Sequence, residues 1–292
     1  MLKGSMVALV TPMKKNGDIN EEKVRFLINW QIKNKTDAIL VCGTTGESAT
    51  LSHSEHKYLV QIAVEEARGR VPIIAGAGSN STKEALDLTL HAKKVKADAA
   101  LVITPYYNKP TQEGLYQHFK KIASRVSIPI IIYNVPSRTG SNILPETVAR
   151  AYKSCKNIIG IKEASGSLDQ ATKLMSRVDS KFLLISGCDE VTIPLMSIGC
   201  RGVISVSANI VPKENASMIH AYLNGDVEKA KKMQLHLYDL IKALFMETNP
   251  IPVKTAMSLM GLIELNMRLP LYKMSANNLA SFKKILKRYK LL

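Results

Sequence analysis

Eight short apolar runs, separated by segments of helical pattern, constrain the fold of this 292-residue chain more than any other feature. Most runs are continuously apolar rather than alternating, which is typical of parallel strands covered on both faces. Strands that alternate with helices indicate β-α units, and eight units predict a closed (β/α)8 barrel (TIM barrel) of the α/β class. The runs are Met6–Val10, Ala38–Cys42, Ile73–Gly76, Ala99–Ile103, Pro129–Tyr133, Ile158–Ile161, Phe182–Ile185 and Gly202–Val206.

The intervals between the runs carry apolar residues at helical spacing. Ser81, followed three residues later by Glu84, predicts a capping box. An open doubly wound sheet is the alternative fold, but it does not need eight units. Its usual dinucleotide fingerprint is also missing, because Gly76-Ala77-Gly78 lacks the third glycine. The expected helices are Glu21–Lys33, Ser54–Arg68, Ser81–Val95, Thr111–Val126, Pro145–Tyr152, Leu168–Val178 and Glu190–Ile198.

The strand pattern stops after Val206, and the rest of the chain shows helical segments only. We therefore expect residues 1–225 to form the barrel and residues 226–292 to form a C-terminal helical extension. No linker rich in Gly, Ser or Pro separates the two parts, which predicts that the extension packs on the barrel.

Composition excludes several classes of protein. Hydrophobic residues make up 46% of the chain, so it carries enough apolar surface to fold. No apolar run approaches the roughly 18–20 residues that a membrane span needs, and the start of the chain lacks a secretory signal pattern. The scattered cysteines (Cys42, Cys155, Cys188 and Cys200) predict reduced thiols. We expect a cytoplasmic protein with no membrane partner.

The formal net charge of +16 raises the question of nucleic-acid binding. The basic residues are spread along the chain, mostly beside Glu and Asp on helical segments. Only residues 283–290 concentrate them, and this tail predicts an amphipathic final helix with a solvated face. No nucleic-acid-binding signature accompanies it, so we expect no nucleic-acid partner.

Lys162 is the sharpest chemical signal, because it follows a buried strand at the end where barrels place their chemistry. Strand alternation puts Gly160 and Lys162 on one face and Ile159 and Ile161 on the other. If the isoleucines face the helices, the lysine points into the barrel mouth above Gly160. Desolvation lowers the pKa of a buried amine, and a neutral amine attacks a ketone to form a Schiff base. The alternative is a lysine that forms an ion pair, with Glu163 as its partner.

Three further segments follow predicted strands at the same end of the barrel, and each has both a functional and a purely structural interpretation. Tyr133 ends the neighbouring strand, where its phenol could shuttle protons or could simply be a satisfied core hydroxyl. The segment Gly43-Thr44-Thr45-Gly46 offers hydroxyls and backbone N–H groups to a small carboxylate, or is only a tight turn. Arg138 lies in a loop pinned by Pro136 and Gly140, where it could clamp a second carboxylate or be an ordinary surface arginine.

Taken together, these segments resemble the dihydrodipicolinate synthase / N-acetylneuraminate lyase family of class I (Schiff-base) aldolases. The matching stretches are Gly43–Ser48, Thr104–Asn108, Tyr133–Gly140 and Gly160–Ala164. The resemblance covers nearly the whole chain and is closest to the synthase members. It implies a lyase that condenses pyruvate with L-aspartate 4-semialdehyde to 4-hydroxy-tetrahydrodipicolinate, in lysine and diaminopimelate biosynthesis. It implies no metal or organic cofactor.

The resemblance also implies roles for individual residues. Lys162 would form the imine with pyruvate, and Tyr107 would reach in from a neighbouring subunit to join a proton relay. The resemblance also implies a homotetramer built as a dimer of dimers. The implied catalytic residues are Lys162, Tyr133, Thr44 and Tyr107, and the implied substrate-binding residues are Thr45 (pyruvate carboxylate), Arg138 (semialdehyde carboxylate), Gly187 and Ile204.

A second site follows from the same resemblance, because family members under feedback control bind L-lysine at a subunit interface. Glu84 would pair with the ammonium groups of the inhibitor, and Tyr106 lies next to Tyr107. The spacing of His53 and His56 could instead suggest a metal, but no third ligand is evident, and two exposed histidines at a helix start are the plain alternative. The matching residues are Ser48, Ala49, His53, His56, Asn80, Glu84 and Tyr106.

The chain departs from the family pattern after the seventh run. Family members often read Ser-Gly-Asp-Asp there, whereas this chain has Ser186-Gly187-Cys188-Asp189-Glu190. Two other functions stay open: another pyruvate aldolase, such as a sialic-acid or keto-sugar-acid lyase, and a non-enzymatic basic scaffold. Arg138 and the Tyr106-Tyr107 pair favour the synthase.

Overall fold

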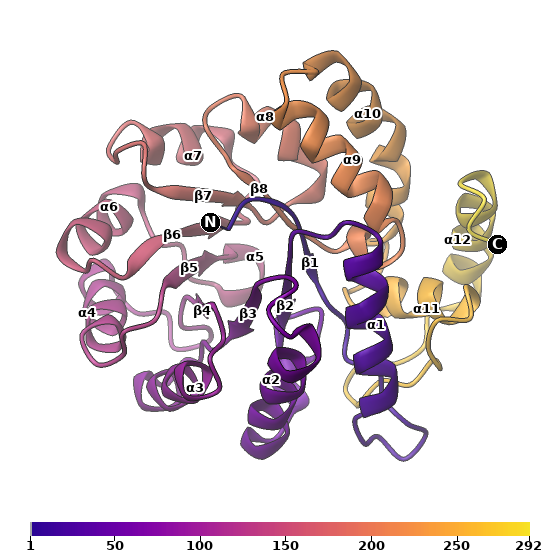
Figure 1. Ribbon diagram of the computed structural model, residues 1–292, viewed down its shortest axis with the longest axis horizontal. Coiled ribbons are helices and arrows are strands. Elements are labelled where there is room, and N and C mark those ends of the chain that lie inside the picture. The colour runs from indigo at the N-terminus through magenta and orange to yellow at the C-terminus, as the bar shows by residue number, and fades with distance from the viewer. Residues whose placement is uncertain (1) are drawn as a thin grey trace.

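Eight parallel strands close into a barrel in the computed structural model, which describes residues 2–292 (Figure 1). Each strand pairs with the next along the chain, and β8 pairs with β1 to close the ring. The prediction of a (β/α)8 barrel is therefore confirmed. The strands are β1 (Gly4–Ala8), β2 (Ala38–Val41), β3 (Ile73–Gly76), β4 (Ala99–Ile103), β5 (Ile130–Asn134), β6 (Ile158–Glu163), β7 (Leu183–Ser186) and β8 (Gly202–Ser205).

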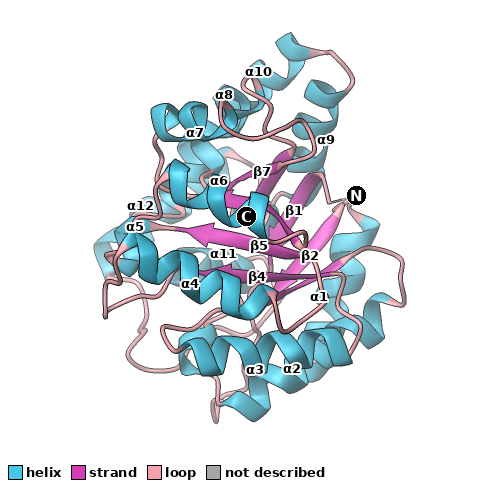
Figure 2. Cartoon of the chain, turned by 90° about the vertical axis from the view of Figure 1, so that its left-hand side faces the viewer, coloured by secondary structure: helices cyan, strands magenta, loops and turns pink. Residues whose placement is uncertain are grey.

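Helices surround the strands, as the side view in Figure 2 also shows. The seven helices expected between the runs are confirmed, with ends that shift by a few residues. They are α1 (Glu21–Lys33), α2 (His53–Ala67), α3 (Thr82–Lys94), α4 (Gln112–Ala123), α6 (Pro145–Ser154), α7 (Leu168–Met175) and α8 (Thr192–Met196). The short α5 (Pro136–Thr139) was not predicted, and α9 (Pro212–Leu223) follows β8.

The capping box lies on a different helix from the one predicted. Ser81 caps α3 and accepts from the Glu84 backbone N–H, but the Glu84 carboxylate accepts from the Ser79 hydroxyl (2.7 Å) instead of reaching back to its own cap. The complete box is formed by Ser52 and Glu55 at the start of α2. The Glu84 carboxylate is held by Ser79, whose hydroxyl also accepts from the Ser81 backbone N–H (3.1 Å).

Strand alternation divides the apolar side chains between two cores. One core lies between the strands and the helices, and the smaller one fills the barrel interior. The interior core includes Met6, Leu40, Ile74, Leu101, Ile131, Ile185 and Ile204. Because these side chains fill the barrel, a ligand can enter only at its ends.

A bulge in β6 corrects one detail of the expected alternation. The register of β5 against β6 shifts between Ile130 and Ile131, so that one residue of β6 is extra. Ile158 and Ile161 pack in the outer core, whereas Ile159 packs against the interior core. The prediction that Ile159 faces the helices is therefore wrong, while Ile161 faces them as expected.

The chain beyond α9 is helical, with α10 (Val227–Ala243), α11 (Ile251–Leu259) and α12 (Ala276–Arg288) on one side of the barrel (Figure 1). The expected boundary after residue 225 falls in the turn between α9 and α10, and we propose it as the division between barrel and extension. Arg268 links the two parts, because its guanidinium donates to the Glu55 carboxylate and to the Thr50 carbonyl (2.7 Å).

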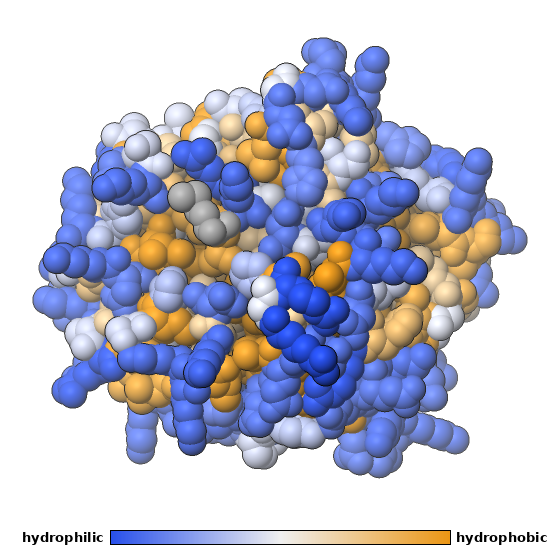
Figure 3. All heavy atoms as spheres, in the orientation of Figure 1, coloured by the Kyte–Doolittle hydropathy of each residue, from blue (hydrophilic) through white to orange (hydrophobic). Residues whose placement is uncertain are grey.

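The final helix is amphipathic, as the basic tail predicts. Phe282 and Leu286 are buried, whereas Lys283, Lys287 and Arg288 are exposed. Figure 3 shows hydrophilic side chains spread over the face in view, with apolar atoms between them. Among residues 2–292 no helix combines the length and hydrophobicity that crossing a membrane requires.

His118 is a buried titratable group in the helical layer. Its side chain is 5% exposed, its Nδ1 lies 2.9 Å from the Thr82 hydroxyl, and its Nε2 has no partner among the described residues. Burial lowers the pKa of His118 to about 4. Since the unfolded chain binds a proton near pH 6.5 and the folded protein resists it, stability must fall as the pH drops from about 6.5 toward 4.

We predict that His118→Gln reduces this acid sensitivity. In the native protein, His118 should lower the free energy of unfolding by up to about 3 kcal/mol between pH 7 and pH 4. Each unit of pKa shift corresponds to about 1.4 kcal/mol. Urea unfolding at pH 7 and pH 4.5 measures the difference, and the pH 7 value reports any cost of the substitution itself. If the free energy of unfolding fell by the same amount in both proteins between pH 7 and pH 4.5, the prediction would be contradicted.

Candidate functional site

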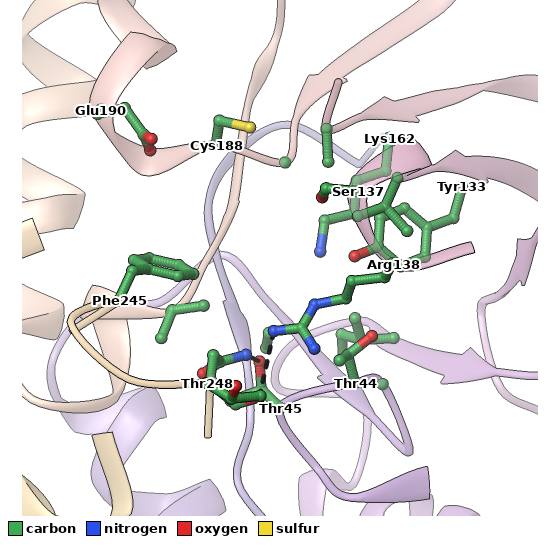
Figure 4. Close-up of a pocket in the computed structure, with 18 of the residues that line it drawn as sticks. Thr44, Thr45, Tyr133, Ser137, Arg138, Lys162, Cys188, Glu190, Phe245 and Thr248 are labelled. Carbon is green, nitrogen blue, oxygen red and sulfur yellow. Dashed lines mark hydrogen bonds between the residues drawn. The ribbon is translucent and has the colours of Figure 1, made fainter. Parts of the chain in front are cut away.

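A cavity of about 610 Å³ opens at the carboxyl ends of the strands. Figure 4 shows Lys162, Tyr133, Arg138, Thr44 and Thr45 converging on it from different elements of the barrel. The loop after β7 and residues 245–249, from the start of the extension, form the opposite wall. The cavity therefore gathers side chains that are far apart in the sequence.

Lys162 points into this cavity with its amine free of carboxylates. The side chain is 6% exposed, and its Nζ lies 4.5 Å from the centroid of the Tyr133 ring, its neighbour across the β5–β6 pair. Glu163 points the other way, where it accepts from the Asn134 amide (3.2 Å) and the Ser165 backbone N–H (2.7 Å). Lys162 forms no ion pair with any residue in 2–292. The ion-pair alternative is thus not realised, because the strand places the two side chains on opposite faces.

Two glycines make room around this lysine. A Cβ on Gly187 would lie 3.1 Å from the Lys162 Cε and 2.5 Å from the Ala164 Cβ. A Cβ on Gly160 would lie 2.0 Å from the Leu183 carbonyl oxygen of the adjacent strand. Gly187 therefore leaves the space that the Lys162 side chain crosses, and Gly160 lets β6 and β7 approach.

The Thr44-Thr45 loop is both a tight turn and an open donor site. The Gly46 N–H donates to the Gly43 carbonyl (3.0 Å) and the Glu47 N–H donates to the Thr44 carbonyl (3.1 Å). The N–H groups of Thr44 and Thr45 donate to no acceptor within residues 2–292. Since these two amides are free, the loop can take a carboxylate without unfolding its turn.

Asn249 holds this loop and Arg138 in place, and the sequence reasoning did not assign it a role. Its Nδ2 donates to the Thr45 hydroxyl (3.0 Å), and its carbonyl accepts from the Arg138 guanidinium (3.2 Å). The side chain is 5% exposed and lines the cavity. Its sequence signal is the Asn249-Pro250 step before α11, which follows no strand.

The loop after β7 also lines the cavity, as the departure from the family pattern suggests. Asp189 anchors it, because its buried carboxylate accepts from the Ser207 N–H (2.8 Å) and the Ser205 hydroxyl (3.0 Å). Cys188 and Glu190 then face the cavity (Figure 4). Burial raises the pKa of the Cys188 thiol to about 12, so it stays protonated at neutral pH.

Two expected site residues lie away from the cavity in the single chain. Tyr107 is 88% exposed, on a loop where its backbone takes a left-handed conformation (φ 72°). Ile204 is buried in the interior core, and Val206 is the residue of that stretch that lines the cavity. The roles of Tyr107 and Ile204 therefore stay predictions.

A second cavity of about 500 Å³ lies beside the first. Its lining includes six of the seven residues predicted for the inhibitor site: Ser48, Ala49, His53, His56, Glu84 and Tyr106. Asn80 is not in the lining, and its carbonyl accepts from the Asn108 amide (3.0 Å). Burial lowers the pKa of His56 to about 4, so its imidazole is neutral at pH 7. Within residues 2–292 no cluster of three or more His, Cys, Asp or Glu could hold a metal ion.

We predict that Gly187→Ala blocks the chemistry of Lys162 without unfolding the barrel. The added methyl group must displace the lysine side chain or Ala164, because both lie within 3.1 Å of it. Trapping with pyruvate and borohydride, read by mass spectrometry at residue 162, should slow at least tenfold, since about 1.4 kcal/mol suffices for that. Gly114→Ala on α4, where the nearest atom is the Pro110 Cβ at 3.2 Å, is the control. Trapping of both variants at the native rate would contradict this account.

The comparisons with known proteins agree with the geometry. Residues 1–289 match the model of the Dihydrodipicolinate synthetase family. A protein from Citrifermentans bemidjiense, named 4-hydroxy-tetrahydrodipicolinate synthase, is 52% identical over the full length of both chains. The chloride-inhibited dihydrodipicolinate synthase from Acinetobacter baumannii, solved in complex with pyruvate, is 43% identical over all of both chains, with a TM-score of 0.97. The enzyme from Cyanidioschyzon merolae, solved with lysine bound, is 38% identical over 99% of each chain, with a TM-score of 0.96. The chain therefore belongs to the dihydrodipicolinate synthetase family.

Proposed function

We propose that this protein condenses pyruvate with L-aspartate 4-semialdehyde to give 4-hydroxy-tetrahydrodipicolinate, as a Schiff-base lyase of lysine and diaminopimelate biosynthesis. The observation that carries the proposal is the buried Lys162 amine, which has no carboxylate partner and faces Tyr133 in a cavity that also holds Arg138. The family membership and the pyruvate complex of the Acinetobacter baumannii relative support the same activity.

The reaction begins when the Lys162 amine attacks the ketone carbon of pyruvate and water leaves, which forms an imine. The protonated imine nitrogen withdraws electrons, so the methyl carbon of pyruvate loses a proton and becomes an enamine. That carbon attacks the aldehyde of the second substrate, and the amine of the second substrate then displaces Lys162 as the ring closes. The lysine acts as the electron sink, so the proposal needs no metal or organic cofactor.

Proton transfer in these steps falls to Tyr133, Thr44 and Tyr107. Tyr133 is beside the amine, and the Thr44 side chain lines the cavity. Tyr107 would join them from a second subunit of a homotetramer, built as a dimer of dimers, and its exposure in the single chain supports that arrangement.

Two groups, both held by Asn249, would orient the carboxylates. The Thr45 hydroxyl and the free amides of Thr44 and Thr45 would hold the pyruvate carboxylate. Arg138 lines the same cavity and would take the carboxylate of the semialdehyde, for which its planar guanidinium is well suited. Gly187 and Ile204 would contribute backbone to the pocket wall.

We propose L-lysine as a feedback inhibitor that binds the second cavity. The lysine-bound relative from Cyanidioschyzon merolae and the six matching residues of the lining support this. Glu84 would pair with an ammonium group of the inhibitor, and neutral His56 would add no repelling charge. The protein is proposed to act in the cytoplasm, which four free cysteine thiols support.

We predict that Lys162→Arg abolishes turnover, because a guanidinium stays charged and cannot form the imine. In a coupled assay with pyruvate and aspartate semialdehyde, activity should fall roughly a thousandfold or more. Wild-type protein should show borohydride trapping at residue 162, and the variant should not. Full activity in the variant would contradict the proposal. Turnover of sialic acid by the wild-type protein, instead of the semialdehyde, would identify it as a sialic-acid lyase.

We predict that Glu84→Gln weakens inhibition by L-lysine and leaves turnover without lysine unchanged. Loss of one hydrogen bond between charged groups should raise the half-inhibitory concentration about tenfold. Asp87→Asn on the same helix is the matched control, since its carboxylate pairs with Lys57 (2.7 Å) outside the cavity. Equal inhibition of wild type and Glu84→Gln would show that lysine does not bind through this carboxylate.

A further inference from the structure

The Lys254 and Glu47 side chains form an ion pair that is completely buried, with both at 0% exposure. Lys254 lies in α11 of the extension, and Glu47 ends the Gly43–Glu47 turn of the barrel. Glu47 holds its place in a left-handed backbone conformation (φ 56°), which is unfavourable for a residue with a side chain. Neither residue has a step in the proposed reaction.

The pair is part of a closed set of hydrogen bonds beneath the Thr44-Thr45 loop. The second oxygen of Glu47 accepts from the Arg268 backbone N–H (3.2 Å), and the Lys254 amine also donates to the Thr11 carbonyl (3.0 Å). The Thr11 hydroxyl in turn donates to the Gly46 carbonyl (2.7 Å). Two segments of the extension and the loop after β1 therefore meet at the underside of this turn.

The same pair fixes the distance between the turn and Asn249. α11 begins at Ile251, so Lys254 lies one helical turn after the Asn249-Pro250 step and donates its backbone N–H to the Pro250 carbonyl (3.0 Å). Asn249 then bonds Thr45 with its side chain and Arg138 with its carbonyl. Movement of α11 relative to the turn would displace the contacts of Thr45 and Arg138 together.

Stability alone is a weak reason for a pair of this kind. Withdrawing two charges from water is costly, and well-packed apolar residues of similar size often serve stability as well or better. What distinguishes the pair from apolar packing is that its hydrogen bonds are directional, and they join α11 to Glu47 of the turn and to the Thr11 carbonyl.

We propose that Lys254 and Glu47 are positioning residues for the reaction, which hold α11 against the Thr44-Thr45 turn so that Thr45, Asn249 and Arg138 keep the geometry that binds the two carboxylates. This rests on the proposed function. The pair acts through Thr45 and Asn249 and touches neither substrate.

Three variants test the proposal: Lys254→Met, Glu47→Gln and the double variant that combines them. Each single variant leaves the other group buried without its charged partner and should lower the melting temperature. The double variant removes both charges, so it should regain much of that loss. In all three, kcat/KM for pyruvate should fall at least about tenfold through a raised KM, because small displacements of binding groups have effects of this size.

Leu115→Ala, which leaves a void in the packing of α4 and lines neither cavity, is the control for lost stability. It should lower the melting temperature and leave KM unchanged. Recovery of both melting temperature and KM in the double variant, or a native KM in every variant, would overturn the proposal. The wild-type protein is assayed alongside by turnover and by borohydride trapping. If the wild-type protein shows neither turnover nor trapping, the proposed function is wrong. If it shows both, the results with the variants test the positioning role alone.

Discussion

Closure of the parallel barrel is the constraint on which the rest of the structure depends. Because all eight strands run the same way and β8 pairs with β1, every strand ends at one rim. A closed parallel barrel fills its interior with side chains, here Met6, Leu40, Ile131 and their neighbours, so the rim is the place where polar groups can meet. The site is therefore assembled from strand ends rather than from any one segment.

Within that rim, the environment of the Lys162 amine is set by the absence of a carboxylate beside it. Alternation along β6 sends Glu163 outward to Asn134 and Ser165, so the nearest carboxylate in sequence cannot neutralise the amine. Gly187 leaves the space through which the lysine side chain passes. An amine that is buried beside an aromatic ring, with no counter-ion, is the arrangement that the proposed Schiff-base chemistry uses.

The sequence predicted the parts of this site that depend on strand order. Lys162 and Tyr133 end consecutive strands of a barrel, so their contact followed from the register. The bulge that turns Ile159 inward could not be foreseen, because it depends on how β5 and β6 fit together rather than on composition. The same holds for the Glu84 carboxylate, which is taken by Ser79 instead of the expected cap.

Asn249 shows a different limit of sequence reasoning. It follows no strand, and its role arises because the extension returns over the rim and lays residues 245–249 along the cavity wall. An asparagine before a proline is common in turns, so nothing local distinguishes this one. Only the tertiary contacts with Thr45 and Arg138 do so.

The two cavities share a wall, so the catalytic site and the inhibitor site that we propose would be built partly from the same side chains. Thr44, Arg138, Thr248 and Asn249 line both of them. A ligand in the second cavity would therefore contact Thr44 and Arg138, which we propose bind substrate in the first, with no need for a long relay through the fold. Because protein interiors are packed as densely as crystals, a shift imposed on one side of such a thin wall must appear on the other. The extension supplies Thr248 and Asn249 to this wall, and so takes part in both sites while it lies outside the barrel.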